Sequence, residues 1–199
     1  MKSFLFVLCL VLASNSQLLA QRSAGSLGSS ALGLLMANEF SKEESLYKAK
    51  EFIMTSTLGV TDEPAKFETF ALAAATSGEL TSLVYRSEEK HKEGLLLAFY
   101  GMQVNEAGLR IQGYGFKDLP KAKAVELLAR LDAVLEKHTS YLRSDSDNNN
   151  LYFKYDDLTF LLYAPSGMEV RMRVFWGQFD SEWNISAFHK TERRMAKKI

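Results

Sequence analysis

The spacing of apolar and polar positions predicts helices near both ends and in the middle of the chain. The clearest pattern covers residues 120–142, where apolar side chains recur at helical spacing on one face and charged side chains lie off it. The predicted apolar face comprises Val125, Leu128, Leu131, Leu135 and Leu142. An earlier helix is expected from the capping box Ser41–Glu44 to about Thr55. A last helix is expected to begin at Ser181, as its N-cap, and to run to the C-terminus.

Between these helices the apolar period falls to two residues, which predicts strands. The expected strands are 80–86, 95–104, 109–116, 151–155, 158–164 and 168–176. Short polar connections join them, whereas a parallel crossover needs about a dozen residues or more, so neighbouring strands should be antiparallel. Segment Pro64–Ser77 fits either a helix or a buried strand; its alanines and the following Gly78 favour a helix. The pattern predicts an α+β fold with antiparallel β-meanders packed against three to four helices.

The first twenty residues are typical of a secretory signal peptide. Lys2 forms a short basic region, Phe4–Ala13 is an uninterrupted apolar stretch, and Leu18–Ala20 fits a cleavage site. An apolar stretch of ten residues spans about 15 Å as a helix, about half of the hydrocarbon core, so we expect no permanent membrane span. The predicted organisation is a signal peptide at 1–20, a flexible uncharged leader at 21–37 and a single compact domain at 38–199.

The net charge and the cysteine content exclude several classes of function. The 24 basic and 24 acidic side chains balance, so the chain has no net field to attract a nucleic acid. The only cysteine, Cys9, lies in the predicted signal peptide, so the mature chain would have no disulfide, thiol nucleophile or thiolate metal site. Export without disulfides favours a bacterial envelope, and we expect a secreted or periplasmic protein.

The C-terminal segment combines basic and aromatic side chains that could bind a ligand. Arg171 and Arg173 alternate with apolar residues and should share the exposed face of a strand. Trp176 and Trp183 follow closely, and basic and aromatic groups together suit an anionic glycan, a lipid headgroup or a peptide carboxylate. The alternative interpretation places the tryptophans in the core.

Oxygen-bearing residues after the central helix partly match a calcium loop. Positions 1, 3, 5 and 12 of the pattern are Asp145, Asp147, Asn149 and Asp156, and the Leu151 carbonyl takes position 7. Asn150 stands where the pattern needs glycine, and a strand follows the loop instead of a helix. The alternative is an ordinary Asn/Asp turn that ends a helix and begins a strand.

No catalytic motif is evident. His91, His138 and His189 are far apart, and none has a partner at metal-ligand spacing or near a nucleophilic serine motif. We therefore expect an exported, non-catalytic binding or accessory module of the cell envelope. Its expected partner is an envelope protein, a glycan or an anionic ligand. No cofactor is expected, with calcium at the partly matching loop as the alternative. The alternative is a small exported hydrolase whose site is assembled from residues distant in sequence.

Overall fold

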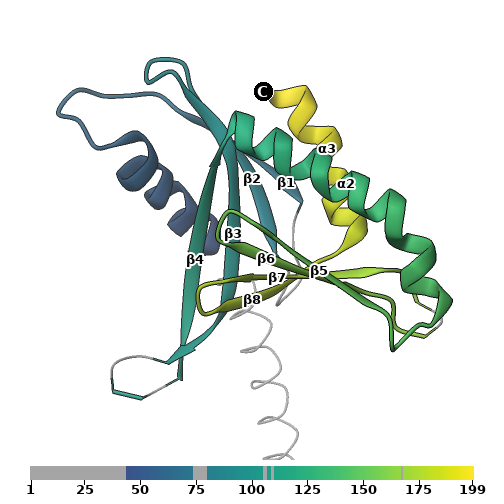
Figure 1. Ribbon diagram of the computed structural model, residues 1–199. Helices are drawn as coiled ribbons and strands as arrows, with labels where there is room; N and C mark the ends of the chain where they lie inside the picture. The colour runs from purple at the N-terminus through teal and green to yellow at the C-terminus, as the bar shows by residue number, and fades with distance from the viewer. Residues whose placement is uncertain (1–43, 74–79, 105–106, 109, 167) are drawn as a thin grey trace, which may run out of the picture. The chain divides into compact units, whose positions relative to one another are not determined.

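Two four-stranded antiparallel sheets and the helices beside them make up the fold (Figure 1). The computed structural model describes residues 44–73, 80–104, 107–108, 110–166 and 168–199. Sheet A has the order β1-β2-β3-β4 and sheet B the order β5-β6-β7-β8, so each sheet is a meander in chain order. The strands are β1 Glu68–Ala73, β2 Thr81–Ser87, β3 Lys92–Val104, β4 Arg110–Pro120, β5 Asn150–Tyr155, β6 Leu158–Tyr163, β7 Arg171–Trp176 and β8 Phe179–Trp183. The predicted α+β class and antiparallel pairing are confirmed.

Both faces of sheet A are buried. Helical residues 44–52 continue into a π-helical segment, η1 (Ile53–Leu58), and pack on one face of the sheet through Ala49 and Ile53. They meet Leu83 and Tyr85 of β2 and residues of β3. The intervening positions of the same strands, such as Val84, point to the main core on the other face. Because both faces are covered, successive residues of β2 are buried, and the strand lacks a clean polar alternation.

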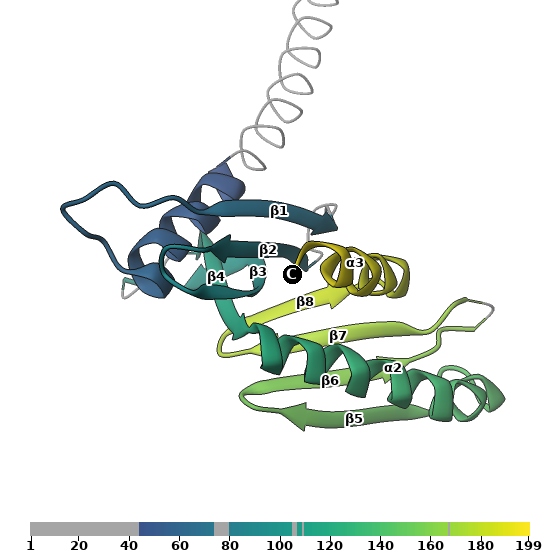
Figure 2. The ribbon, with the colours of Figure 1, turned by 90° about the horizontal axis from the view of Figure 1, so that it is seen from above.

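The main core lies between sheet A, sheet B and two helices, α2 (Lys121–Ser144) and α3 (Ile185–Lys198). Helix α2 joins the sheets and lies along one face of sheet B (Figure 2). Its buried face comprises Ala124, Leu127, Leu128, Leu131, Leu135 and Leu142. Four of the five predicted stripe residues are therefore confirmed, but Val125 is 53% exposed. Val125 is one position beyond Ala124, so a rotation of about 100° carries it off the stripe.

Helix α3 fixes the C-terminal part of the chain to sheet A. It packs chiefly along β1, and Thr191 Oγ1 lies 2.6 Å from Ser82 Oγ of β2 in a buried hydrogen bond. Arg194 Nη1 donates to the Leu72 carbonyl of β1 at 2.8 Å. The sheets are also joined directly, since the Leu80 amide donates to the Glu182 carbonyl at 2.8 Å. Residues Ser45–Ile199 consequently form one unit.

The predicted helix over Pro64–Ser77 is wrong where the structure describes it. Residues 68–73 form β1, which pairs with β2, and residues 74–79 lie outside the described ranges. Alanine favours a helix only weakly, and strand pairing together with the cover of α3 outweighs that preference.

The prediction that Ser181 caps the last helix is also wrong. Ser181 is buried in β8, and Asn184 is the cap, with its Oδ1 accepting from the Ser186 amide at 2.8 Å. Gly177, at φ 57°, makes the tight turn that returns the chain from β7 into β8. The strand predicted for 168–176 begins only at Arg171. The other five predicted strands and the central helix are confirmed, with small shifts at their ends.

The predicted signal peptide, the leader and the capping serine Ser41 lie outside the described residues.

Candidate binding surface

Sheet B presents one face to the core and the opposite face to solvent. Alternate side chains of a strand point to opposite faces, so the core-facing positions of β6 and β7, such as Phe160 and Val174, place the other set on the opposite face, where these two strands are half-buried. We call this set the outer face. Its members are Asn150, Tyr152 and Lys154 of β5, Thr159, Leu161 and Tyr163 of β6, Arg171, Arg173 and Phe175 of β7, and Asp180 and Glu182 of β8. Among the described residues, α2 and α3 lie on the other side of this sheet, so no described helix covers the outer face (Figure 2).

The strand register arranges the outer face in rows. One row crosses all four strands and runs Tyr152, Leu161, Arg173 and Glu182. Tyr152 is 79% exposed on the edge strand, whereas Leu161 is half-buried by its neighbours. Tyrosine and arginine are among the residues that most often anchor protein interfaces. The row is therefore a candidate contact strip.

Two acidic side chains of β8 hold the arginines of this face. Arg173 donates through Nε and Nη2 to Asp180 Oδ1 and Oδ2 at 2.8 and 2.9 Å, a bidentate pair. The hydrogen bond to Asp180 raises the pKa of the Arg173 guanidinium above its usual value. Arg171 Nη1 lies 3.6 Å from Glu182 Oε2. Both guanidinium groups are thus oriented within the face, and their charges are largely balanced there.

The predicted binding residues divide between the two faces of sheet B. Arg171 and Arg173 do share the outer face, as their spacing indicated. Trp183 lies on the core side, has no exposed surface and packs edge-on against Phe188 at 5.5 Å. Trp176 is also on the core side, where its Nε1 donates to Asp157 Oδ2 at 2.8 Å.

The aromatic side chains that do accompany the arginines are Tyr152, Tyr163 and Phe175. Phe175 belongs to the aromatic group that the sequence places beside the arginines, and it has the same strand parity as Arg171 and Arg173. The two tyrosines come from other strands and needed the cross-strand register.

The predicted calcium ligands do not converge. Asp145 and Asp156 lie beyond opposite ends of β5, whose six residues span about 20 Å. Asp145 Oδ1 accepts from Asn148 Nδ2 at 2.9 Å, and Asp147 Oδ1 accepts from the Ser166 amide at 3.0 Å. The Asn149 side chain donates to the Tyr141 carbonyl at 2.7 Å, so it acts as a donor within a turn. These bonds are those of a polar turn between α2 and β5.

Asp156 belongs instead to a charged cluster that ties the β5–β6 turn to β4 and α2. It lies 3.1 Å from Lys123 Nζ and 3.4 Å from Lys117 Nζ, and these contacts lower the pKa of its carboxyl group. Burial alone would raise the pKa of Asp157, but hydrogen bonds from Lys117 and Trp176 outweigh it and lower that pKa. Burial would also lower the pKa of Lys117, yet the two aspartates raise it. The cluster joins the two sheets by charge.

An open cavity of about 410 Å³ lies near the C-terminal end of α2. Its lining comprises Arg143, Ser146, Ala164, Pro165, Met168 and Glu169. No described histidine lines it, so Ser146 has no imidazole base there.

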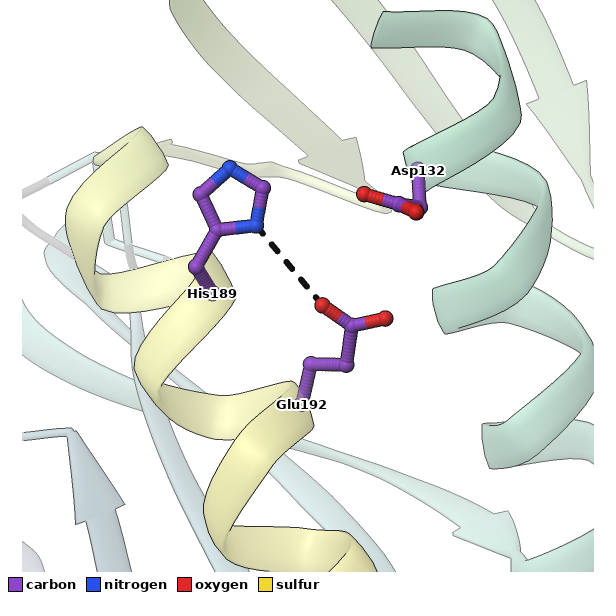
Figure 3. A group of neighbouring side chains, drawn as sticks. All are labelled: Asp132, His189 and Glu192. Atoms are coloured by element: carbon purple, nitrogen blue, oxygen red, sulfur yellow. Dashed lines mark ion pairs between the residues drawn. The ribbon is translucent and has the colours of Figure 1, made fainter. Parts of the chain in front are cut away.

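A group of titratable side chains lies between α2 and α3 (Figure 3). Asp132 of α2 faces His189 and Glu192 of α3. Each residue offers one atom that could bind a metal ion, and these three atoms lie within 4.8 Å of one another. His189 Nδ1 is 3.6 Å from Glu192 Oε2. The spacing of three residues between these two positions could have shown that they share a helix face, but Asp132 is remote in sequence.

Comparisons with known proteins add no relative. The sequence matches no known family model, and searches of curated proteins and of solved structures found no similar protein. Within the described residues, no helix has both the length and the apolar character needed to cross a membrane.

Proposed function

We propose that this protein is an exported, non-catalytic binding module of the cell envelope, and that the outer face of sheet B receives a protein partner. The observation that carries the proposal is a four-stranded sheet with its helices on one side and aromatic and arginine side chains on the other. Tyr152, at 79% exposure, projects from that face and would serve as its anchor.

Charge balance favours a protein partner over an anionic glycan or headgroup. The outer face carries three basic side chains, Lys154, Arg171 and Arg173, and two acidic ones, Asp180 and Glu182. Because the acidic groups already bind the arginines, a phosphate or a carboxylate-rich polymer would have to displace them. A mixed polar and aromatic protein surface can pair with both signs of charge without that exchange.

The envelope part of the proposal rests on the predicted signal peptide. If residues 1–20 direct export, the protein recovered from its cells begins at Gln21, because cleavage is expected after Ala20. Mass spectrometry of the N-terminal peptide tests this. An N-terminus retained at Met1 in protein from the cytosol would contradict the envelope assignment.

The binding surface is tested by two alanine substitutions matched in residue type and exposure. Tyr152→Ala removes the outer-face anchor, whereas Tyr47→Ala removes a tyrosine that is 65% exposed on the N-terminal helix. Both variants should fold with stability close to wild type, since exposed substitutions usually change it by about 0.5 kcal/mol or less. The assay compares affinity capture from envelope extract, quantified by mass spectrometry.

We expect one set of partners with the wild type and with Tyr47→Ala, and a loss of about 30-fold or more with Tyr152→Ala, as for an interface anchor worth about 2 kcal/mol. Equal recovery by both variants would overturn the assignment of the outer face. Recovery of only further copies of this chain would replace the envelope partner with self-association.

A further inference from the structure

Two helices from different parts of the chain bring two carboxylates and an imidazole to one point. Asp132 projects from α2 toward His189 and Glu192, which lie one turn apart on α3 (Figure 3). The three atoms that could bind a metal ion lie within 4.8 Å of one another, and His189 Nδ1 is 3.6 Å from Glu192 Oε2. All three side chains reach the protein surface, so an ion could enter from solvent.

The negative charge of Asp132 is uncompensated among the described residues. Asp132 makes no hydrogen bond or ion pair with any described residue, and the ion-pair partner of Glu192 is His189. Throughout the described ranges, no lysine or arginine lies within 4.0 Å of either carboxylate. Two carboxylates that face each other without a cation repel, whereas a bound cation would offset both charges.

We propose that Asp132, His189 and Glu192 bind one divalent transition-metal ion of the zinc type between α2 and α3. Calcium and magnesium prefer oxygen ligands alone, whereas imidazole with carboxylate suits zinc and its neighbours. In a tetrahedral zinc site the ligand atoms are about 3.4 Å apart, because each lies about 2.0–2.2 Å from the metal. The His189–Glu192 distance is already near this value, and Asp132 needs a shift on the order of 1 Å.

The ion would add a link at the surface between two helices that also share the main core. Helix α2 packs on β3, β4 and β5, and α3 packs chiefly along β1. Three protein ligands leave a fourth position for a water molecule. Binding would stabilise the folded chain, since the unfolded chain does not hold the three ligands together.

The test uses the purified protein without a histidine tag, stripped of metal by a chelator and titrated with zinc chloride in a calorimeter. We expect one ion per chain, micromolar or tighter affinity and a raised melting temperature. Excess calcium should not displace the ion. Titration with cobalt(II) gives an independent signature, because a tetrahedral site absorbs visible light more strongly than hydrated cobalt does.

Three variants locate the ligands. Asp132→Asn and His189→Ala should weaken zinc binding by at least about tenfold, since loss of even an outer-shell partner of a ligand costs roughly 10–100-fold. His138→Ala is the control, because it removes a partly exposed histidine that lies on α2 outside the proposed site. This variant should bind zinc as the wild type does. Asp132→Asn changes only a surface carboxylate, so it keeps the test valid if His189→Ala unfolds.

Three results would overturn the proposal. The first is that the wild type does not bind zinc at micromolar concentration. The second is that Asp132→Asn binds zinc with wild-type affinity. The third is that, of the three variants, only His138→Ala loses zinc binding.

Discussion

The junction between the sheets depends on a close approach that only glycine allows at position 115. A Cβ atom built on Gly115 of β4 would lie 2.3, 2.7 and 2.8 Å from ring atoms of Phe179 at the start of β8. Carbon atoms pack at about 3.5–4.0 Å, so Gly115→Ala would push the ring back by more than about 1 Å. The ring has little room, because Phe99 and Trp176 lie against it at centroid distances of 6.0 and 6.1 Å.

This clash sets the expected destabilisation. Overpacking of this kind costs about 1–3 kcal/mol, and replacing glycine by alanine returns about 0.4–1 kcal/mol through the unfolded chain. Gly115→Ala should therefore lower the free energy of unfolding by about 1–2 kcal/mol, measured by urea denaturation. Phe179→Ala alone should also destabilise the protein, since the ring packs against the main core.

The double variant isolates the contact. Without the Phe179 ring, Gly115→Ala should cost less than about 0.5 kcal/mol, which corresponds to a coupling energy of about 1–2 kcal/mol between the two positions. If Gly115→Ala costs as much in the Phe179→Ala background as in the wild type, the hairpin of β7 and β8 does not rest on β4 as described.

Three further predictions concern stability. Leu131→Ala, at a fully buried position of α2, should lower the free energy of unfolding by about 2–5 kcal/mol in the same urea assay, and a cost below 1 kcal/mol would contradict its place in the core. Thr191→Val keeps the side-chain shape but leaves the Ser82 hydroxyl unpaired, so it should cost about 1–3 kcal/mol, and adding Ser82→Ala should recover part of that loss. Asp157 has a lowered pKa in the folded state, so its contribution is present above its unfolded pKa of about 3.9 and is lost as the pH falls through the folded value. Unfolding of Asp157→Asn measured between about pH 6 and pH 3 should accordingly show a weaker loss of stability on acidification than the wild type, and parallel curves would refute the pairing.

The elements with strong periodicity were predictable from sequence. Helix α2 shows a long apolar stripe at helical spacing, and its leucines are buried as expected. Short connections link β2 to β4 within one sheet and β5 to β7 within the other, and they made the antiparallel pairing of these strands predictable. Local patterns sufficed here because the apolar periodicity and the turn chemistry indicate the same elements.

The sequence favours a helix over a strand for the β1 segment and gives no sign of β8, because tertiary contacts outweigh the local signals there. β1 is rich in alanine, and pairing with β2 decides its conformation. In β8, Ser181 resembles a helix cap, yet it lies buried in a strand. The five residues of β8 are too few for an alternating pattern to stand out against a following helix.

The candidate surfaces were predictable only in part, for the same physical reason. Arg171 and Arg173 share a face because strand parity is a local property. The turn at Gly177 moves Trp183 to the core side, and the pattern of β7 gives no sign of that change. Asp132 and His189 meet because two helices that are distant in the sequence pack near each other, which no spacing along the chain records.

The most direct test of the binding surface is photo-crosslinking in living cells with a photoreactive amino acid at single positions. Position 152 reports on the outer face of sheet B, and position 141, where a tyrosine of α2 is 48% exposed, reports on a different surface. We predict a discrete crosslinked product with an envelope protein from position 152 and none from position 141. Products of equal yield from both positions, or none from position 152, would contradict the account.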